Sequence, residues 1–336
     1  MNPIKAIALL SGGLDSTLAV RLVLDQGIEV IAINFVTPFC TCTAKGKKCA
    51  SSQTSASQLG VELVRKSLVE EYFKIIEHPK FGYGRGINPC IDCRILKLKK
   101  AAELMKERGA QFLITGEVVG QRPMSQKLLT LLKIEKEAGL EGLVLRPLSA
   151  KVLPETIPEK KGWVDRSKLL GITGRSRKPQ IQLAEEKNIV DYPCPAGGCM
   201  LTQPEFAVKV RDLIEHHIPL NSNDIALIKI GRHFRISKHA KLVVGKNDSE
   251  NKTILSLVKT DDLLILTDNV PGPAGLLRGK FGSEEIQKAL KLIAYYVHKT
   301  DSKEVPFVLK YNDRDKQEKA LATAFEREIL ESYRIK

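Results

Sequence analysis

The six residues from Ser11 to Ser16, Ser-Gly-Gly-Leu-Asp-Ser, constrain the fold more than any other part of the sequence. They follow an apolar, β-rich run, Lys5 to Leu10, and lead into a helical pattern from Ser16 to Gln26 that Gly27 ends. A strand, a glycine turn and a helix in this order point backbone amides and the positive helix end at the carboxyl edge of a sheet, where phosphate binds readily. The segment therefore predicts an α/β domain with an anion site at its first turn.

Further strands and helices alternate after this unit. Alternation of this kind predicts an α/β fold, a parallel sheet with helices on both faces. The expected strands are Glu29 to Phe35, Glu62 to Ser67 and Gln111 to Thr115, and the expected helices are Ser52 to Gln58 and Arg94 to Arg108.

The pattern changes after an irregular stretch rich in Pro, Gly and basic residues, Lys151 to Pro204, which holds one helix, Pro179 to Lys187. A smaller α+β domain is expected next, which divides the chain into domains 1–204 and 205–336. Its expected elements are a helix from Phe206 to His216, strands around Ala226 to Ile236 and Lys241 to Val244, and a terminal helix from Ser283 to Lys299.

The composition favours a polyanionic partner. The formal charge is +14 and the pI about 9.4, and residues 1–200 carry 30 Lys and Arg against 20 Asp and Glu, which leaves +4 for the remainder. Clustered cations gain affinity for nucleic acid by releasing counterions from phosphates. No apolar run of about 18 residues and no secretory cleavage site is seen, so a cytoplasmic protein without a membrane partner is expected.

The phosphate loop supplies groups suited to a nucleotide. Its glycines let the backbone approach an anion, the hydroxyls of Ser11, Ser16 and Thr17 can bind it, and Asp15 can hold Mg²⁺ or orient the attacking group. An ordinary strand-to-helix turn would use similar residues. The loop lacks the Walker lysine and the Rossmann glycine spacing.

Ser-Gly-Gly-x-Asp-Ser resembles the signature of the PP-loop ATP pyrophosphatase superfamily. The resemblance implies an adenine-nucleotide hydrolase-like fold that cleaves ATP between the α and β phosphates and transfers AMP to a carbonyl or carboxylate oxygen. The residues that would grip pyrophosphate and magnesium are then Ser11, Gly12, Gly13, Asp15 and Ser16.

The seven cysteines favour thiol chemistry or metal binding over disulfides. Cys90 and Cys93 form a CxxC immediately before a basic helix, and a thiolate at a helix N-terminus has a lowered pKa. Asn-Pro-Cys-x-x-Cys resembles the tRNA 2-thiouridylases, in which a cysteine of this region carries the transferred sulfur. Cys194 or Cys199 would supply its partner.

Two sulfur mechanisms fit these residues. In one, a cysteine holds a persulfide that a second cysteine resolves as a disulfide. In the other, which the distant third cysteine favours, Cys90, Cys93 and Cys194 or Cys199 ligate a [4Fe-4S] cluster with one open iron. A separate group, Cys40, Cys42 and Cys49, indicates zinc or a redox role, or consists of simple loop thiols.

Residues that follow the fourth strand are expected to line the ligand edge of the sheet. Thr115-Gly116-Glu117 with Gly120-Gln121 resembles a segment of tRNA 4-thiouridine synthases that lies close to the nucleotide, and Leu145-Arg146-Pro147-Leu148 resembles their Arg-Pro-Leu element. The nucleotide-binding candidates are thus Asn34, Thr115, Gly116, Glu117 and Gln121.

Basic residues in both halves are candidates for RNA contact. The segments Gly231 to Arg235 and Lys241 to Asn251 resemble the small RNA-binding domain NFACT-R, although a structural β-hairpin would also explain them. The RNA-binding candidates are Arg94, Arg146, Arg175, Arg177, Lys178, Arg232, His233, Arg235 and Lys246.

The resemblances together imply an ATP-dependent tRNA sulfurtransferase that adenylates a uridine carbonyl oxygen and replaces it with sulfur. ATP and Mg²⁺ would be required, and a donor protein or sulfide would supply sulfur. The usual 4-thiouridine synthases carry a THUMP domain ahead of the phosphate loop, which begins here at residue 11, so tRNA recognition would fall to the second domain or a partner. The alternatives are another adenylating PP-loop reaction, such as amidation or small-molecule sulfur insertion, and a non-catalytic RNA- or ribosome-associated protein.

Overall fold

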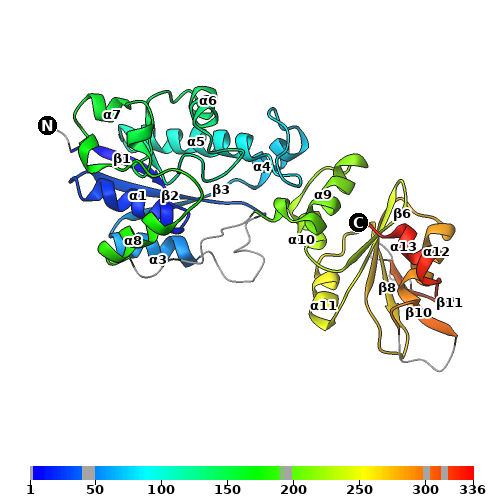
Figure 1. The fold of residues 1–336 in the computed structure, drawn as a ribbon. Helices are drawn as coiled ribbons and strands as arrows, with labels where there is room; N and C mark the ends of the chain where they lie inside the picture. Colours follow the sequence, from blue (N-terminus) through cyan, green and yellow to red (C-terminus); the bar gives the residue numbers. More distant parts are fainter. Residues whose placement is uncertain (1–2, 40–49, 190–191, 193–198, 298–302, 312–316) are drawn as a thin grey trace. The chain divides into compact units, whose positions relative to one another are not determined.

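The computed structural model describes residues 3–39, 50–189, 192, 199–297, 303–311 and 317–336 (Figure 1). They belong to two compact units, Met1–Thr202 and Gln203–Lys336. The domain boundary expected from the sequence, between residues 204 and 205, lies two residues after the boundary in the structure, between residues 202 and 203.

The first unit is built on a five-stranded sheet in the order β3-β2-β1-β4-β5, and every pair of neighbours is parallel. The central strand, β1, carries the phosphate loop at its carboxyl end. The α/β fold class expected from the sequence is confirmed. The strands are β1 (Lys5–Leu9), β2 (Glu29–Val36), β3 (Glu62–Ser67), β4 (Phe112–Thr115) and β5 (Val144–Leu145).

Helices cover both faces of this sheet (Figure 1). Alternate side chains of β1 explain why, since Ala6 and Ala8 pack into one apolar cluster and Ile7 into another. The first cluster includes α1 (Leu14–Leu24), α3 (Ala50–Leu59) and α8 (Lys178–Glu186), and the second includes α5 (Cys90–Glu107) and α6 (Leu128–Ala138). The shorter helices α4 (Val69–Glu77) and α7 (Ile157–Lys160) complete the set of α-helices that the structure describes in this unit.

The second unit is an antiparallel sheet in the order β11-β10-β8-β9-β7-β6. Helix α12 packs on one face through Leu290 and Ile293, and α10 and α11 pack on the other through Leu227 and Ile254. The strands are β6 (Arg232–Ser237), β7 (Ala240–Val244), β8 (Leu263–Thr267), β9 (Gly275–Gly279), β10 (Glu304–Tyr311) and β11 (Gln317–Thr323), and the helices are α9 (Pro204–Glu215), α10 (Ser222–Ile228), α11 (Asp248–Ser256), α12 (Ser283–Ala294) and α13 (Arg327–Tyr333).

Two expectations for this unit were wrong. The strand expected from Ala226 begins instead as helix α10, because the Asn221 side chain caps it by accepting a hydrogen bond from the Asp224 amide at 3.0 Å. The helix from Ser283 is not terminal, since it ends at Ala294 and the β10–β11 hairpin and α13 follow.

Among the described residues, no helix combines the length and apolar character needed to cross a membrane.

Candidate active site

The phosphate loop turns directly from β1 into α1, with Gly13 as the N-cap of the helix. Gly12 has a φ of +77°, and a Cβ at this position would lie 2.4 Å from the carbonyl carbon of Ser51 at the start of α3. A side chain is therefore excluded by both backbone conformation and space. The loop amides consequently stand at the helix N-terminus, as an anion site requires.

Hydroxyl groups hold the loop in shape. Ser16 Oγ donates to the Gly13 carbonyl at 2.9 Å and lies 3.1 Å from Ser11 Oγ. Thr17 Oγ1 reaches the same carbonyl at 3.1 Å and Ser55 Oγ at 3.2 Å. Because Thr17 is fully buried, its hydroxyl supports the loop from behind, whereas Ser11 is exposed and accessible to a ligand.

Asp15 offers a free carboxylate oxygen. Its Oδ2 accepts a hydrogen bond from Gln121 Nε2 at 3.1 Å and lies 3.8 Å from Arg177 Nη2. Its Oδ1 is buried and has no hydrogen-bond partner among the residues that the structure describes. A hard cation such as Mg²⁺ prefers such an oxygen, so Asp15 fits the predicted magnesium ligand.

The ends of β2 and β4 complete this edge of the sheet. A Cβ on Gly116 would lie 2.5 Å from the Ser16 amide nitrogen, so the turn after β4 touches the start of α1. Asn34 donates from Nδ2 to the Leu10 carbonyl at 2.8 Å, while its Oδ1 lacks a partner among the described residues. Asn34, Gly116 and Gln121 thus lie against the loop, and their binding of a nucleotide stays a prediction.

A buried ion-pair network stands behind this edge. Glu117 Oε2 accepts hydrogen bonds from Thr115 Oγ1 and Arg146 Nε, both at 3.1 Å, and its Oε1 lies 3.5 Å from Arg94 Nε. Arg146 also contacts Glu135 on α6. Burial acts to raise the pKa of Glu117, but Arg94 and Arg146 together hold that pKa below its ordinary value. The carboxylate is therefore ionised at neutral pH.

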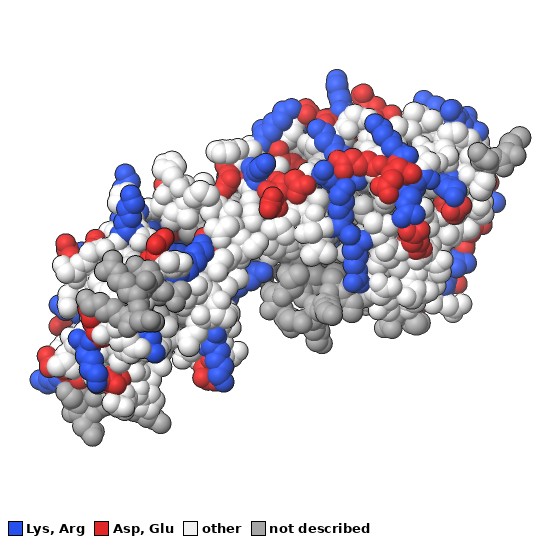
Figure 2. All heavy atoms as spheres, turned by 180° about the vertical axis from the view of Figure 1, so that it is seen from behind, with Lys and Arg blue, Asp and Glu red and all other residues white. Residues whose placement is uncertain are grey.

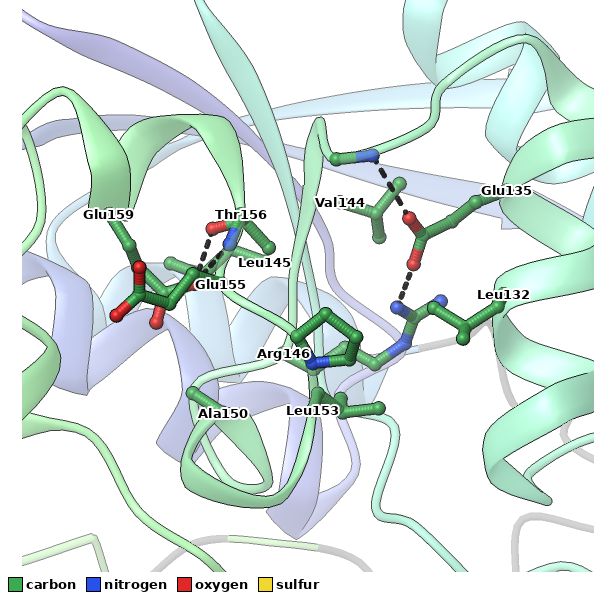
Figure 3. Close-up of a pocket in the computed structure, with 12 residues that line it drawn as sticks. Leu132, Glu135, Val144, Leu145, Arg146, Ala150, Leu153, Glu155, Thr156 and Glu159 are labelled. Atoms are coloured by element: carbon green, nitrogen blue, oxygen red, sulfur yellow. Dashed lines mark hydrogen bonds and ion pairs between the residues drawn. The ribbon is translucent and has the colours of Figure 1, made fainter.

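Figure 3 shows a cavity of about 70 Å³ beside this network, into which the Arg146–Glu135 pair projects between Leu132, Val144 and Leu153. Ligand pockets usually measure about 300–1,000 Å³. The cavity is therefore too small for a nucleotide, and nucleotide binding at the loop edge stays a prediction.

Three cysteines, Cys90, Cys93 and Cys199, lie within electrostatic range of one another. Cys90 and Cys93 stand on the first turn of α5, where the Cys93 amide donates to the Pro89 carbonyl at 2.9 Å. Cys199 precedes a 3-10 turn, Met200–Thr202, and its sulfur accepts a hydrogen bond from the Leu201 amide. The charge on Cys93 raises the pKa of Cys90 and that of Cys199, in each case more than the charge on any other cysteine does. Cys93 therefore lies close to both.

The expected lowering of the thiol pKa at the start of α5 was wrong for Cys90. Burial and the neighbouring Cys93 raise the pKa of Cys90, against the opposing effect of Arg94, Arg122 and Lys97. Burial also raises the pKa of Cys199 to about 12. Desolvation of a thiolate outweighs the helix terminus here, so both thiols are protonated at neutral pH.

A group of cations joins the loop to the cysteines. Burial lowers the pKa of Arg122, and Arg94 and Arg177 lower it further, while Cys90 and Asp15 raise it. Arg122 is therefore within electrostatic range of both the phosphate loop and the first cysteine. Sequence reasoning did not select Arg122 as a site residue, although it directly follows Gln121 in a segment that was singled out.

The RNA-binding candidates have very different surroundings. Arg146 and His233 are each 2% exposed, and His233 Nε2 lies 2.7 Å from the Ile230 carbonyl, so direct RNA contact by these two residues was a wrong prediction. Four candidates are half-buried: Arg94, Arg177, Arg232 and Arg235. The contacts of Arg94 and Arg177 are described above. Arg232 lies 4.3 Å from the centre of the Tyr296 ring, and Arg235 is paired with Asp212. Arg175, Lys178 and Lys246 are exposed.

Charge is mixed on the surface in view. On the face that Figure 2 shows, the Lys and Arg side chains of the described residues are interspersed with Asp and Glu side chains. The net charge therefore does not form one continuous basic patch on that face. Cys40, Cys42, Cys49 and Cys194 lie outside the described residues.

The fold and loop define a class: a PP-loop nucleotide-binding domain followed by an antiparallel α+β domain. Residues 3–153 match the family model described as thiamine biosynthesis protein (ThiI), and residues 231–334 match the model described as NFACT protein RNA binding domain. Two segments of the chain are therefore similar to these two families, which confirms the resemblances found in the sequence.

Relatives share parts of this chain. A tRNA-specific 2-thiouridylase MnmA of Marinobacter nauticus is 25% identical over 257 residues, which cover 70% of this chain but only 60% of that protein. A 4-thiouridine synthetase–RNA complex with bound ATP is 21% identical, covering 67% of this chain and 52% of that one, with a TM-score of 0.36. The U34-tRNA thiolase NcsA of Methanococcus maripaludis with its [4Fe-4S] cluster is 18% identical, covering 68% and 71%, with a TM-score of 0.33.

Proposed function

We propose that the protein is an ATP-dependent tRNA sulfurtransferase that adenylates a uridine carbonyl oxygen and replaces it with sulfur. One observation carries the proposal: the cysteine helix and the phosphate loop both contact the turn after β4. Arg94, next to Cys93, lies 3.5 Å from Glu117, and a Cβ on the adjacent Gly116 would lie 2.5 Å from the Ser16 amide nitrogen. The activation step and the sulfur step would therefore take place in one site. The ThiI-family match over residues 3–153 and the thiouridylase relatives support the substrate class.

The electrostatics of the empty loop favour a polyphosphate. Arg122 lies within electrostatic range of Arg94 and Arg177, and its pKa is lowered first by burial and then by repulsion from these two cations. A bound pyrophosphate group relieves this repulsion, and the loop amides add hydrogen bonds at the N-terminus of α1. Mg²⁺ held by Asp15 Oδ1 would neutralise charge on the phosphates.

The adenylation step makes a poor leaving group into a good one. The uridine carbonyl oxygen attacks the α-phosphorus of ATP, the bond to the β-phosphate breaks, and pyrophosphate leaves. Arg94 and Arg122 would stabilise the negative charge that develops on the phosphates. The carbon then bears an AMP group that sulfur can displace.

The sulfur step fits a persulfide on Cys90. Its terminal sulfur attacks the activated carbon and AMP departs. Cys93, the nearest thiol, then attacks the inner sulfur of Cys90, which forms a Cys90–Cys93 disulfide and releases the thiolated base. Reloading can follow two routes: a reductant reopens the disulfide and a donor protein transfers persulfide sulfur to Cys90, or sulfide attacks the disulfide at Cys90, which forms the persulfide and frees the Cys93 thiol.

A [4Fe-4S] cluster is the other arrangement that the cysteines suggested. Among the described residues, no three Cys, His, Asp or Glu side chains are close enough together to hold a metal ion. Cys194 is not among the described residues, so no step of the proposal passes through a cluster. Iron and acid-labile sulfide, measured after anaerobic purification, test this alternative directly.

The products of ATP cleavage test the proposal. Purified protein, given Mg²⁺, a sulfur source and unmodified tRNA, should release AMP and pyrophosphate, and nucleoside mass spectrometry should find thiolated uridine. Release of ADP and orthophosphate would contradict the proposed class. Release of AMP and pyrophosphate with a carboxylate acceptor, but not with tRNA, would favour the amidation alternative.

A further inference from the structure

The second unit contains a pocket that the proposed reaction does not use. Its volume is about 250 Å³, and it lies between helices α9 and α10 and strands β7 and β9. The two helices precede the region matched by the RNA-binding family model, which begins at residue 231, whereas the two strands lie inside it. The pocket therefore combines the RNA-binding sheet with helices outside the matched region.

The walls of the pocket are largely apolar and their charged groups are already paired. Lys241 Nζ donates to Asp212 Oδ2 at 3.0 Å, and Arg278 is paired with Asp224 and Asp262. A charged ligand group would thus find no free partner among these wall residues. The apolar walls are Leu213, Ile218, Leu227, Ile228 and Val243.

One wall residue has a ring nitrogen free. His216 Nδ1 lies 2.7 Å from the Asp212 carbonyl, which can only accept, so Nδ1 is the donor of this hydrogen bond. In the neutral ring, Nε2 is then an acceptor, and it has no partner among the described residues. The lining of the pocket therefore includes, besides its apolar residues, a histidine with a free hydrogen-bond acceptor.

The rim of the pocket is basic. Lys238 and His239, in the β6–β7 turn, and Lys280, after β9, are exposed and line the pocket. The Lys280 amide donates to the His239 carbonyl at 3.0 Å, and a Cβ on Gly279 would lie 2.0 Å from that carbonyl oxygen. This close approach fixes the two segments side by side. The side chains of Lys238 and Lys280 have no partners among the described residues.

We propose that this pocket binds one unpaired nucleotide of an RNA chain, with the base between the apolar walls and the flanking phosphates on Lys238 and Lys280. The inference rests on the proposed function, in which tRNA is the substrate, and on the match of residues 231–334 to the RNA-binding family model. The faces of a flat base would pack against the apolar walls, and its N–H groups would donate to the His216 acceptor. The phosphates of the RNA backbone would contact the basic rim. A base in a duplex is stacked and paired on its edges, so only a single-stranded or flipped base fits.

RNA binding by the full-length protein tests the proposal. The probe is a single-stranded RNA of about 12 nucleotides with one central 2-aminopurine, compared with the same strand in a duplex. The wild-type protein should bind the single strand more tightly, and the 2-aminopurine emission should change on binding. Equal affinity for both probes, or no binding of either, would overturn the proposal.

Variants separate the pocket from general electrostatic attraction. The double variant Lys238→Ala/Lys280→Ala should bind the single strand several-fold more weakly and reduce the slope of log affinity against log salt by about 0.7 for each phosphate contact. His216→Leu should weaken binding and abolish the emission change. The matched control is Lys252→Ala/Lys319→Ala, which removes the same charge from side chains that are 77% and 79% exposed and lie outside the pocket.

The control outcome decides between two explanations. Equal weakening in both double variants would show general charge attraction and overturn the pocket proposal. Thiolation, measured separately with ATP and tRNA, distinguishes the two proposals: pocket-dependent RNA binding without thiolation would refute only the sulfurtransferase function. Thiolation with RNA binding that is insensitive to the pocket variants would refute only the pocket.

Discussion

Arg146 bridges two buried carboxylates, with its Nε 3.1 Å from Glu117 Oε2 and its Nη1 in contact with Glu135. Its side chain is 2% exposed. Arg146 thereby joins α6 to the turn that follows β4, and so supports the ligand edge from behind. A residue that the sequence made a candidate for RNA contact thus supports this edge from within the fold.

Replacing Arg146 by Met should destabilise the first unit strongly. The change leaves Glu117 and Glu135 without their shared buried partner, and breaking a buried pair in this way costs about 3–5 kcal/mol. Urea unfolding would measure the loss. Arg108→Met, which removes an exposed pair with Glu62, is the control and should cost less than about 1 kcal/mol. Equal effects of the two substitutions would contradict the structural role of Arg146.

Gly116→Ala should impair nucleotide binding. The added Cβ would lie 2.5 Å from the Ser16 amide nitrogen, so the turn after β4 and the start of α1 must separate. A misplacement of about 1 Å in a site can cost about 100-fold in rate. Isothermal titration calorimetry with ATP and Mg²⁺ would measure the loss of binding, and the rate of pyrophosphate release would measure the loss of activity. Gly282→Ala is the control, because its Cβ would meet only the flexible Glu285 side chain, at 3.7 Å. It should leave ATP binding and the rate of pyrophosphate release unchanged.

The sequence predicted the first unit well because its signals are local. The runs around Ile7, Ile31 and Phe112 are apolar and bounded by turns, so they indicate buried parallel strands, and the loop from Ser11 to Ser16 has one structural context. Helix α6 (Leu128–Ala138) was not predicted, because it lies between two motifs and carries no motif of its own. The run from Ala226 to Ile230 read as a strand because an apolar run of this length does not distinguish strand from helix.

The wrong expectations about individual side chains share one cause. Residue type makes Arg146 and His233 candidates for RNA contact, but only the folded chain shows that both are buried. A position at a helix N-terminus favours an acidic thiol for Cys90, and burial reverses the direction of its pKa shift. Burial is a property of the whole fold, and local sequence patterns do not encode it.

Cys199 should react slowly with alkylating reagents. Its pKa is raised from 9.0 to about 12, mainly by burial, and since only the thiolate is the nucleophile, its labelling by iodoacetamide at pH 8 should be about 1,000-fold slower than that of an ordinary thiol. Peptide mass spectrometry over time would follow the reaction. Labelling at the ordinary rate in the native protein, equal to that in urea, would contradict the pKa direction.

The three described cysteines should differ in the sulfur reaction. Cys90→Ser should abolish thiolation while ATP binding persists, because the phosphate loop is unchanged. Cys93→Ser should allow a preloaded Cys90 persulfide to attack the activated base, but no thiol at position 93 is left to release the product. A single turnover would therefore stop with the base joined to Cys90 through a disulfide. Mass spectrometry of the intact protein would detect it. Full multiple turnover by Cys90→Ser would refute the assignment of the carrier.

Lys209→Met should stabilise the second unit at neutral pH. Burial, with a contribution from the cations Lys246 and Lys241, lowers the pKa of Lys209 from 10.5 to about 8. Below pH 8 the ammonium is charged in both folded and unfolded chains, so the folded state bears the full desolvation penalty. After a discount for its partial exposure, removing the charge should raise the free energy of unfolding by about 1–2 kcal/mol, although the hydrogen bond to the Ile228 carbonyl is lost.

The pH dependence gives this prediction its sign. Between pH 8 and about 10.5 the folded state releases its proton while the unfolded chain keeps it, so wild-type stability rises with pH across this window. The advantage of Lys209→Met should therefore shrink as the pH rises from 8 to 10. Hydrogen exchange at the amides of β6 and β7 would measure the stability difference between the two proteins at pH 7. Urea unfolding at pH values up to 10 would show how this difference changes with pH. A constant or growing advantage at high pH would show that desolvation of Lys209 is not the cause.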